Sequence, residues 1–183
     1  MGKKKLIKII VPICIVLVIA GIWIFKNDSG SSGMPPESGE SAGLVTPKND
    51  EDFVLETKSV NLEALTAYGL PIIIDFGSDS CIPCKKMAPV LKTMNEEMQG
   101  KAIIKFLDVW KYPDAANDFP LQVIPTQIFI NADGTPYVPS DNIEIEFTTY
   151  SYKETGEHAF TVHQGGLTED QMRAILADMG VAE

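Results

Sequence analysis

The chain has 183 residues and a net charge of −10 at pH 7, and 45% of its residues are hydrophobic, as in a globular protein of about one domain. Five of its 15 basic residues precede the first acidic one, Asp28, so the remaining 157 residues carry 10 basic and 25 acidic groups. This acidic part would repel phosphate backbones, which argues against nucleic acid as a partner, and three cysteines are too few for a disulfide-stapled scaffold.

The first predicted element is a membrane-spanning helix over residues 9–25, which contain no charged side chain. Counted from Leu6 and interrupted only by Lys8, the apolar stretch is 20 residues long and would rise about 30 Å as a helix, enough to cross the hydrocarbon core of a bilayer. Basic residues gather in the segment 1–8, so the positive-inside rule predicts a cytoplasmic N-terminus and an extracytoplasmic remainder. The alternative is a cleavable signal peptide with a weak small-residue site at residues 18–20. We expect a single-pass cell-membrane protein, held by its own N-terminal helix.

A linker and one domain are predicted to follow the span. Residues 26–52 are rich in glycine, serine, proline and acidic residues and lack apolar periodicity, which indicates a flexible linker. Residues 53–183 are numerous enough to enclose one hydrophobic core. In chain order, apolar periodicity and turn residues predict a helix over 60–68, a strand over 71–76, a helix over 84–98, a strand over 102–107, a short helix over 114–119 and a strand over 126–130.

The last elements are predicted from turn and capping signals. Residues 132–134 are a turn signal that leads into a hairpin. Apolar and polar residues alternate over 143–148, which predicts a lengthened strand pair with its turn at 153–156. Thr168 and Gln171 have the spacing of a capping box and open a final helix. Strands that alternate with helices, followed by a hairpin and a helix, predict an α/β fold.

Two cysteines outside the predicted span, Cys81 and Cys84, carry the clearest chemical signal. They lie directly after a predicted strand and at the start of a predicted helix. The free N–H groups and the positive end of the helix dipole would stabilise a thiolate at Cys81. A thiolate attacks a disulfide, and a second thiol three residues further on can release the resulting mixed disulfide. The pair is therefore predicted to exchange dithiol for disulfide.

Two other interpretations of the pair stay open. A structural zinc site needs four ligands, whereas the chain has no second cysteine pair and only two histidines, His158 and His163. A purely structural disulfide is the other interpretation, although a bridge over three residues would constrain the unfolded chain weakly. We expect no metal and no cofactor, and we assign no role to Cys14, which lies inside the predicted span.

Four motifs of the chain resemble the thioredoxin family, in the order in which that family has them. They are residues 73–76, similar to a strand that ends in a buried aspartate; 81–91, similar to the redox motif and its helix with a kinking Pro89; 124–126, similar to the segment with a cis proline; and 165–167, similar to the turn before the last helix. The resemblance covers residues 53–183. It implies a thioredoxin-like α/β fold, in which helices flank a central mixed β-sheet, with an extended hairpin insertion over about 137–160.

The resemblance also implies the roles of individual residues. Cys81 would be the attacking thiolate and Cys84 the buried resolving thiol, while Asp75 would lie buried behind Cys84 and relay its proton. The alternative for Asp75 is an ordinary carboxylate at a strand end. Lys105 is expected near the position of the lysine that the family pairs with this aspartate. The groove for an extended protein substrate would be lined by Ile82, Pro83, Ile124, Pro125 and Gly165.

The chain departs from the family's pattern near the cysteines. Ser80 stands where thioredoxins usually have tryptophan, and Gly77 replaces another aromatic residue. The surface around the disulfide would therefore be more open and more polar, so general thioredoxin substrates would dock less well. The insertion over 137–160 either selects partners or is decoration.

Three functions are compatible with this sequence. The first is an extracytoplasmic reductase of protein disulfides, supplied with electrons by a transmembrane donor protein. It is favoured because no histidine lies between Cys81 and Cys84, and the resemblance to anchored thioredoxins places it in a bacterial plasma membrane. The second is an oxidase that introduces disulfides into secreted proteins. The third is a non-catalytic module that uses the same groove to bind a partner.

Overall fold

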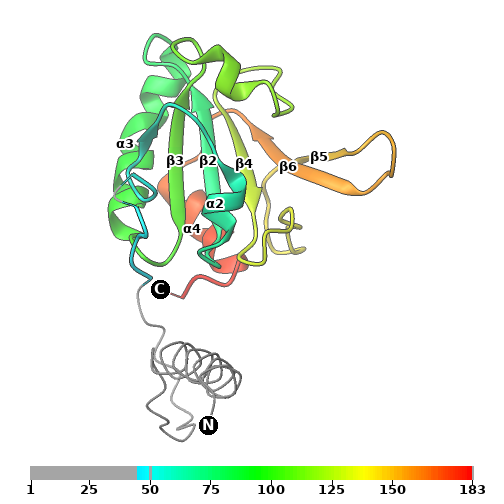
Figure 1. Ribbon diagram of the computed structural model, residues 1–183. Helices are drawn as coiled ribbons and strands as arrows, with labels where there is room; N and C mark the ends of the chain where they lie inside the picture. The colour runs from blue at the N-terminus through cyan, green and yellow to red at the C-terminus, as the bar shows by residue number, and fades with distance from the viewer. Residues whose placement is uncertain (1–44, 50, 183) are drawn as a thin grey trace, which may run out of the picture. The chain divides into compact units, whose positions relative to one another are not determined.

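The computed structural model describes residues 45–49 and 51–182 (Figure 1). The predicted cytoplasmic segment, the predicted span over 9–25 and most of the predicted linker lie outside the described residues. Among the residues that are described, no helix combines the length and the apolar character needed to cross a bilayer.

Within the described residues, six strands form one mixed sheet in the order β1-β3-β2-β4-β6-β5 (Figure 1). The first three in this order run parallel to one another, and each later neighbour is antiparallel. The strands are β1 (Glu56–Thr57), β2 (Ile72–Gly77), β3 (Ile103–Asp108), β4 (Thr126–Ile130), β5 (Thr148–Ser151) and β6 (His158–Gln164). The expected central mixed sheet is confirmed.

Helices cover both faces of this sheet. They are α2 (Leu62–Thr66), α3 (Ile82–Glu97), the 3₁₀ helix η1 (Pro113–Ala116) and α4 (Glu169–Asp178). Alternate residues of β2 pack on opposite sides: Ile73 joins the cluster under α3 and α4, whereas Ile72 and Ile74 join the cluster under α2. Because β2 is covered on both faces, all six of its residues are buried, which explains why its sequence reads as a continuous apolar run.

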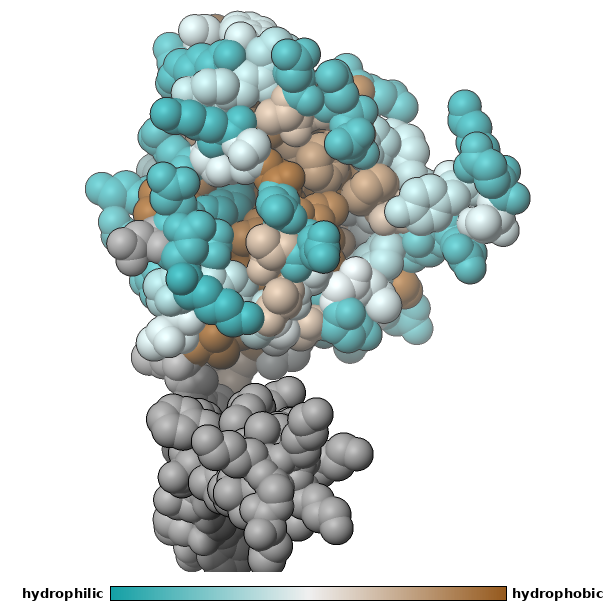
Figure 2. Space-filling model, viewed as in Figure 1, coloured by the Kyte–Doolittle hydropathy of each residue, from teal (hydrophilic) through white to brown (hydrophobic). Residues whose placement is uncertain are grey.

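The two clusters of the core are covered unequally. Helices α3 and α4, of 16 and 10 residues, cover one face, whereas α2, of only five residues, and η1 lie on the other. Apolar surface accordingly emerges between polar side chains on the face that carries α2 (Figure 2). The predicted helices of the covered face are confirmed, and Thr168 and Gln171 form the predicted capping box at α4 with bonds of 3.2 and 2.9 Å.

The folded domain begins earlier than residue 53. The N–H of Val45 donates to the carbonyl of Gly100 at 3.0 Å, and the N–H of Lys48 donates to the Tyr68 hydroxyl at 2.6 Å. Val45 also packs against the cluster under α2. The end of the predicted linker is thus attached to the domain, because one apolar residue in a polar stretch finds a place on the core.

The alternation over 143–148 does not produce the predicted strand. The strand β5 begins only at Thr148, and the preceding residues leave the ladder to cover the core beside α4. There the Phe147 ring packs edge-on against Phe129 and Tyr137, with ring centroids 5.4 and 5.8 Å apart. The conformation of this segment is therefore set by the burial of its side chains and not by strand pairing. The predicted turn at 153–156 does close the β5–β6 hairpin, where the Tyr152 N–H donates to the Glu157 carbonyl at 2.9 Å.

Two shorter predictions also need correction. The turn at 132–134 leads to a single bridge between Ile130 and Pro136 instead of a hairpin, because β4 takes β6 as its antiparallel neighbour. The short helix predicted over 114–119 is the 3₁₀ helix η1, which ends at Ala116.

Candidate active site

Cys81 and Cys84 lie at the N-terminus of α3 and are joined by a disulfide, with their Cα atoms 5.3 Å apart. The helix begins at Ile82, two residues before the predicted start, so Cys81 is its N-cap and the Cys81 Sγ accepts the Cys84 N–H at 3.4 Å. Cys81 is 9% exposed and Cys84 is 4% exposed. An N-cap sulfur next to free helical N–H groups is placed to be stabilised as a thiolate when the disulfide is reduced.

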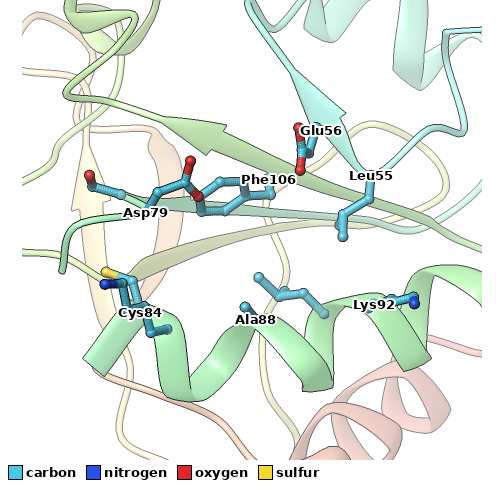
Figure 3. A pocket seen from close by; sticks show the side chains of 10 residues that line it. Leu55, Glu56, Asp79, Cys84, Ala88, Lys92 and Phe106 are labelled. Atoms are coloured by element: carbon cyan, nitrogen blue, oxygen red, sulfur yellow. The ribbon is translucent and has the colours of Figure 1, made fainter. Parts of the chain in front are cut away.

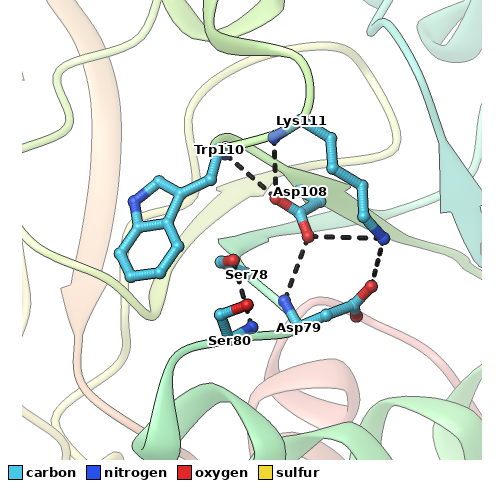
Figure 4. Close-up of polar contacts among 6 residues, drawn as sticks. All are labelled: Ser78, Asp79, Ser80, Asp108, Trp110 and Lys111. Carbon is cyan, nitrogen blue, oxygen red and sulfur yellow. Dashed lines mark hydrogen bonds and ion pairs between the residues drawn. The ribbon is translucent and has the colours of Figure 1, made fainter.

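The loop before Cys81 is held by Asp108, at the end of β3 (Figure 4). The Asp108 carboxylate accepts the N–H groups of Asp79, Trp110 and Lys111, each at 3.0 Å. Burial raises the pKa of Asp108, but these N–H donors and the Lys111 ammonium outweigh it and leave the pKa below its usual value. Lys111 also pairs with the Asp79 carboxylate. The carboxylate thereby ties the loop that carries Ser80 to the loop after β3.

Sequence reasoning missed Asp108, although a signal for it exists. The carboxyl ends of parallel strands meet at one edge of a sheet, and Asp108 ends the parallel neighbour of the strand that leads to the cysteines. A polar residue at that point could have been expected to contact the loop after β2.

The Ile124–Pro125 peptide bond is cis, as the resemblance implied. The carbonyl oxygen of Ile124 lies 3.8 Å from Cys81 Sγ. Behind it, the Gly165 N–H donates to the Pro125 carbonyl at 2.9 Å, so the loop before β4 and the turn after β6 lie together. Ile82, next to Cys81 in the chain, is 71% exposed.

The predicted groove residues therefore lie on two sides of Cys81. Ile82 and Pro83 follow it on α3 and are exposed, and the loop at Ile124 and Pro125 adjoins its sulfur. Gly165 is attached behind this loop. An extended peptide that crosses Cys81 would have the backbone of Ile124 beside it.

Asp75 is fully buried, and burial raises its pKa to about 7 against the opposing hydrogen bond from Gln127. The Gln127 Nε2 donates to Asp75 Oδ1 at 2.6 Å, whereas Oδ2 has no hydrogen-bond partner among the described residues. A Cβ atom at Gly77 would lie 3.3 Å from both Asp75 Oδ2 and Cys84 Sγ. The free carboxyl oxygen of Asp75 and the Cys84 sulfur therefore border the same small space.

Lys105 does not lie beside Asp75. It is paired in register with Ile74, and Phe106 is the residue opposite Asp75. Because side chains alternate along a strand, this offset of one residue sends Lys105 to the other face of the sheet. Its Nζ donates there to the carbonyls of Glu51 and Val54 at 2.5 and 2.7 Å, and burial lowers its pKa.

A pocket of about 430 Å³ opens between α3 and the strands β1 and β3 (Figure 3). In it Cys84 and Ala88 of α3 face Phe106 of β3. A Cβ at Gly77 would lie 2.9 Å from the Phe106 ring and 3.3 Å from Cys84 Sγ, so a side chain there would point towards residues that line this pocket. The other lining residues are Leu55, Glu56, Ser78, Asp79, Lys85, Leu91 and Lys92. The buried glycine thus lets the Phe106 ring and Cys84 Sγ approach each other closely beside this pocket.

The described part of the fold brings no metal-binding group of side chains together. Within residues 45–49 and 51–182, histidine, cysteine and carboxylate side chains nowhere gather in a group of three that could hold an ion.

Comparison with known proteins adds to this geometry. The family model described as thioredoxin matches residues 54–144. Thioredoxin 1 of Chlorobaculum tepidum is 45% identical over 56 residues, 31% of this chain and 55% of that protein. Chloroplastic thioredoxin Y1 of Arabidopsis thaliana is 33% identical over 66 residues, 36% of this chain and 38% of that protein. The chain thus spans about half the length of one relative and less of the other.

Two further matches extend over more of the relatives. The crystal structure of a chloroplastic thioredoxin z covers 70% of this chain and 96% of its own, with a TM-score of 0.50 and 22% identity, which shows the shared fold. The thioredoxin of Buchnera aphidicola is 30% identical over 87 residues, 48% of this chain and 70% of that protein. With this coverage, a Cys81–Cys84 pair at a helix N-terminus and a cis proline beside it, the chain belongs to the thioredoxin family.

Proposed function

We propose that this protein is an extracytoplasmic thiol-disulfide oxidoreductase that reduces disulfides of other proteins through Cys81 and Cys84. The observation that carries the proposal is the arrangement around the pair. Cys81 caps α3 beside the Ile124 carbonyl, and Cys84 borders the same space as the free oxygen of a buried acid, Asp75.

The first step belongs to Cys81. In the reduced protein, its thiolate is stabilised at the N-terminus of α3, where the Cys84 N–H points at the sulfur. The client binds as an extended segment along the backbone of Ile124 and Pro125. The Cys81 sulfur attacks one sulfur of the client disulfide, a mixed disulfide forms, and the other client sulfur leaves as a thiolate.

The second step belongs to Cys84 and Asp75. The Asp75 carboxylate accepts the proton of the Cys84 thiol, and the resulting thiolate attacks Cys81 Sγ. The second client sulfur leaves as a thiolate, and both client thiolates take up protons. The client disulfide has then gained two electrons, and the Cys81–Cys84 dithiol has become the disulfide that the structure contains.

Return to the dithiol needs a reductant. The basic segment 1–8 and the uncharged run 9–25 support a single-pass anchor that leaves the domain outside the cytoplasm. Cytosolic reductants do not reach a domain on that side. The reductant is therefore a transmembrane donor protein that offers a dithiol, and the membrane is that of a bacterium.

Reduction of insulin disulfides by dithiothreitol tests the activity with the full-length chain in detergent. The wild-type protein accelerates the reaction, and both Cys81→Ser and Cys84→Ser abolish the acceleration. Cys14→Ser is the matched control, because it makes the same change at the third cysteine, and it retains the wild-type rate. Equal rates for the wild type and both active-site variants would leave a binding module as the function.

The order of attack is tested by trapping. Cys84→Ser should accumulate a client protein bound through Cys81, because no second thiol releases it, whereas Cys81→Ser should accumulate none. Trapping by Cys81→Ser alone would reverse the two roles.

A further inference from the structure

Gln127 is a fully buried polar residue in the middle of the sheet. It lies on β4 directly opposite Asp75 in the register of β2 and β4. The residues that follow it on β4, Ile128 to Ile130, are buried and apolar. A buried amide costs free energy unless its polar atoms are hydrogen-bonded, so its contacts need an explanation.

The two N–H groups of the Gln127 amide point at two acceptors. Nε2 lies 2.6 Å from Asp75 Oδ1 and 3.0 Å from the carbonyl oxygen of Gly165, and Met87 Sδ is 3.2 Å away. A carboxylate and a carbonyl both accept hydrogen bonds, so the nitrogen of the amide faces them. Gly165 in turn donates to the Pro125 carbonyl. A chain of hydrogen bonds thus runs from the buried acid to the loop beside Cys81.

We propose that Gln127 is a positioning residue, which holds the Asp75 carboxylate ready to accept the Cys84 proton and fixes it relative to the loop at Pro125. The inference deepens the proposed function and rests on it. A hydrogen bond to the charged form of an acid favours that form. The amide hydrogen bond therefore opposes the rise that burial causes in the pKa of Asp75. Without this bond, Asp75 would stay protonated to higher pH and could not act as the base.

Few other groups can supply this effect. From β3, the residue opposite Asp75 is Phe106, and from α3 the facing titratable group is Cys84. On β6, His163 is paired in register with Gln127, and its Nδ1 lies 2.9 Å from the Glu146 carbonyl. Because His163 is an ionisable neighbour of Gln127 in the sheet, His163→Asn serves as the check that a measured midpoint belongs to Asp75.

Release of a preformed mixed disulfide at Cys81 by Cys84, measured against pH in the full-length protein, tests the inference. In Gln127→Leu, the midpoint of the rate should move upward by about one pH unit, the size expected when a hydrogen bond to a charged group is lost. Gln99→Leu is the matched control, because Gln99 also donates to a backbone carbonyl but lies just beyond the far end of α3. An unchanged midpoint in Gln127→Leu, or an equal shift in Gln99→Leu, would overturn the proposal.

A second measurement uses the wild-type protein, so it does not depend on whether a variant of Asp75 or Gln127 folds. In the reduced wild-type protein, the ¹⁵N signal of the Gln127 side-chain amide should titrate with a midpoint near that of Asp75, about pH 7, and it should do so in His163→Asn as well. An amide signal that does not respond to pH would contradict the contact. If the wild type failed to release the mixed disulfide at any pH, the proposed function would fail, while the amide titration would still decide whether Gln127 senses Asp75.

Discussion

Gly77 determines how closely the Asp75 carboxyl and the Cys84 sulfur approach each other. A Cβ at this position would meet the Phe106 ring at 2.9 Å, and both Asp75 Oδ2 and Cys84 Sγ at 3.3 Å. The first distance is too short for a real contact, so a side chain would push these groups apart. Gly77 is therefore part of the site, although it has no side chain.

Replacement of Gly77 by alanine tests this role. Gly77→Ala should lower the free energy of unfolding by about 1–3 kcal/mol through overpacking and slow the release of the mixed disulfide. Gly166→Ala is the control for stability, because nothing lies within 4 Å of its Cβ position. Urea unfolding and single-turnover release measure the two effects, and a Gly77→Ala protein as stable as Gly166→Ala would contradict the close approach.

The buried carboxyl of Asp75 predicts an unusual dependence of stability on pH. Its pKa is about 7 in the folded protein and near 3.8 when exposed, so the folded state binds more protons between these values. The free energy of unfolding should then fall as the pH rises from about 4 to about 7. Asp75→Asn removes this slope and should stabilise the protein at pH 8 by at most about 4 kcal/mol.

The same substitution should impair the reaction. The side-chain amide introduced by Asp75→Asn keeps an oxygen that can accept the Gln127 N–H, but it cannot take a proton, so release of the mixed disulfide at pH 8 should slow by about 100-fold. Urea unfolding at several pH values, with Asp118→Asn as an exposed control, measures the stability. A slope that remains in Asp75→Asn would mean that another group carries it.

Part of the site could be predicted from the sequence: the Cys81–Cys84 pair from its place between a strand and a helix, and Pro125 and Asp75 from the resemblance to thioredoxins. Cys81, Cys84 and Pro125 lie together as expected, and Asp75 is buried near Cys84. Gln127 was missed because a single polar residue in an apolar strand has no sequence signal for its partner. The predicted position of Lys105 was wrong by one residue. Because side chains alternate along a strand, this places Lys105 on the opposite face of the sheet from Asp75.

The N-terminus of α3 depends on the loops that lead to it. The three N–H groups that Asp108 accepts come from two loops, Asp79 from the loop after β2 and Trp110 and Lys111 from the loop after β3 (Figure 4). A buried carboxylate with several N–H partners stabilises such loops, and its loss leaves the N–H groups without acceptors. The position of Cys81 therefore rests partly on a residue at the end of another strand.

Removal of this carboxylate tests the connection between loop and site. Asp108→Ala should lower the free energy of unfolding by about 2 kcal/mol, within the range for a buried group left unpaired, and should reduce the rate of insulin reduction. Asp118→Ala makes the same change at an exposed aspartate and should alter neither quantity. Equal behaviour of the two variants would show that Asp108 does not hold the loop.

Helices and buried strands were predictable wherever periodicity, caps and glycines agreed. The strand β4 matches its predicted bounds, and the capping box opens α4. The segment 143–147 was not predictable as irregular, because its residues do alternate between half-buried and exposed, as they would in a strand. The pattern could not indicate that the burial of Phe147 comes from an aromatic cluster with Phe129 and Tyr137 and not from pairing in the sheet.

The orientation of the whole chain is a prediction from residues 1–25. Added protease should digest the domain in intact bacterial cells that express the full-length chain, because the positive-inside rule places the domain outside the cytoplasm. A cytoplasmic marker protein in the same cells should stay intact. Protection of the domain while lysed cells lose it would contradict the outward orientation and the need for a transmembrane donor.

The reduction potential of the Cys81–Cys84 pair tests the central claim, that the molecule donates electrons to protein disulfides, most directly. The full-length Cys14→Ser variant, which retains only this pair of thiols, is equilibrated in detergent with dithiothreitol buffers of known potential. A reductase predicts a value of about −270 mV or lower. A value of about −120 to −180 mV would contradict the claim and identify an oxidase that introduces disulfides into secreted proteins.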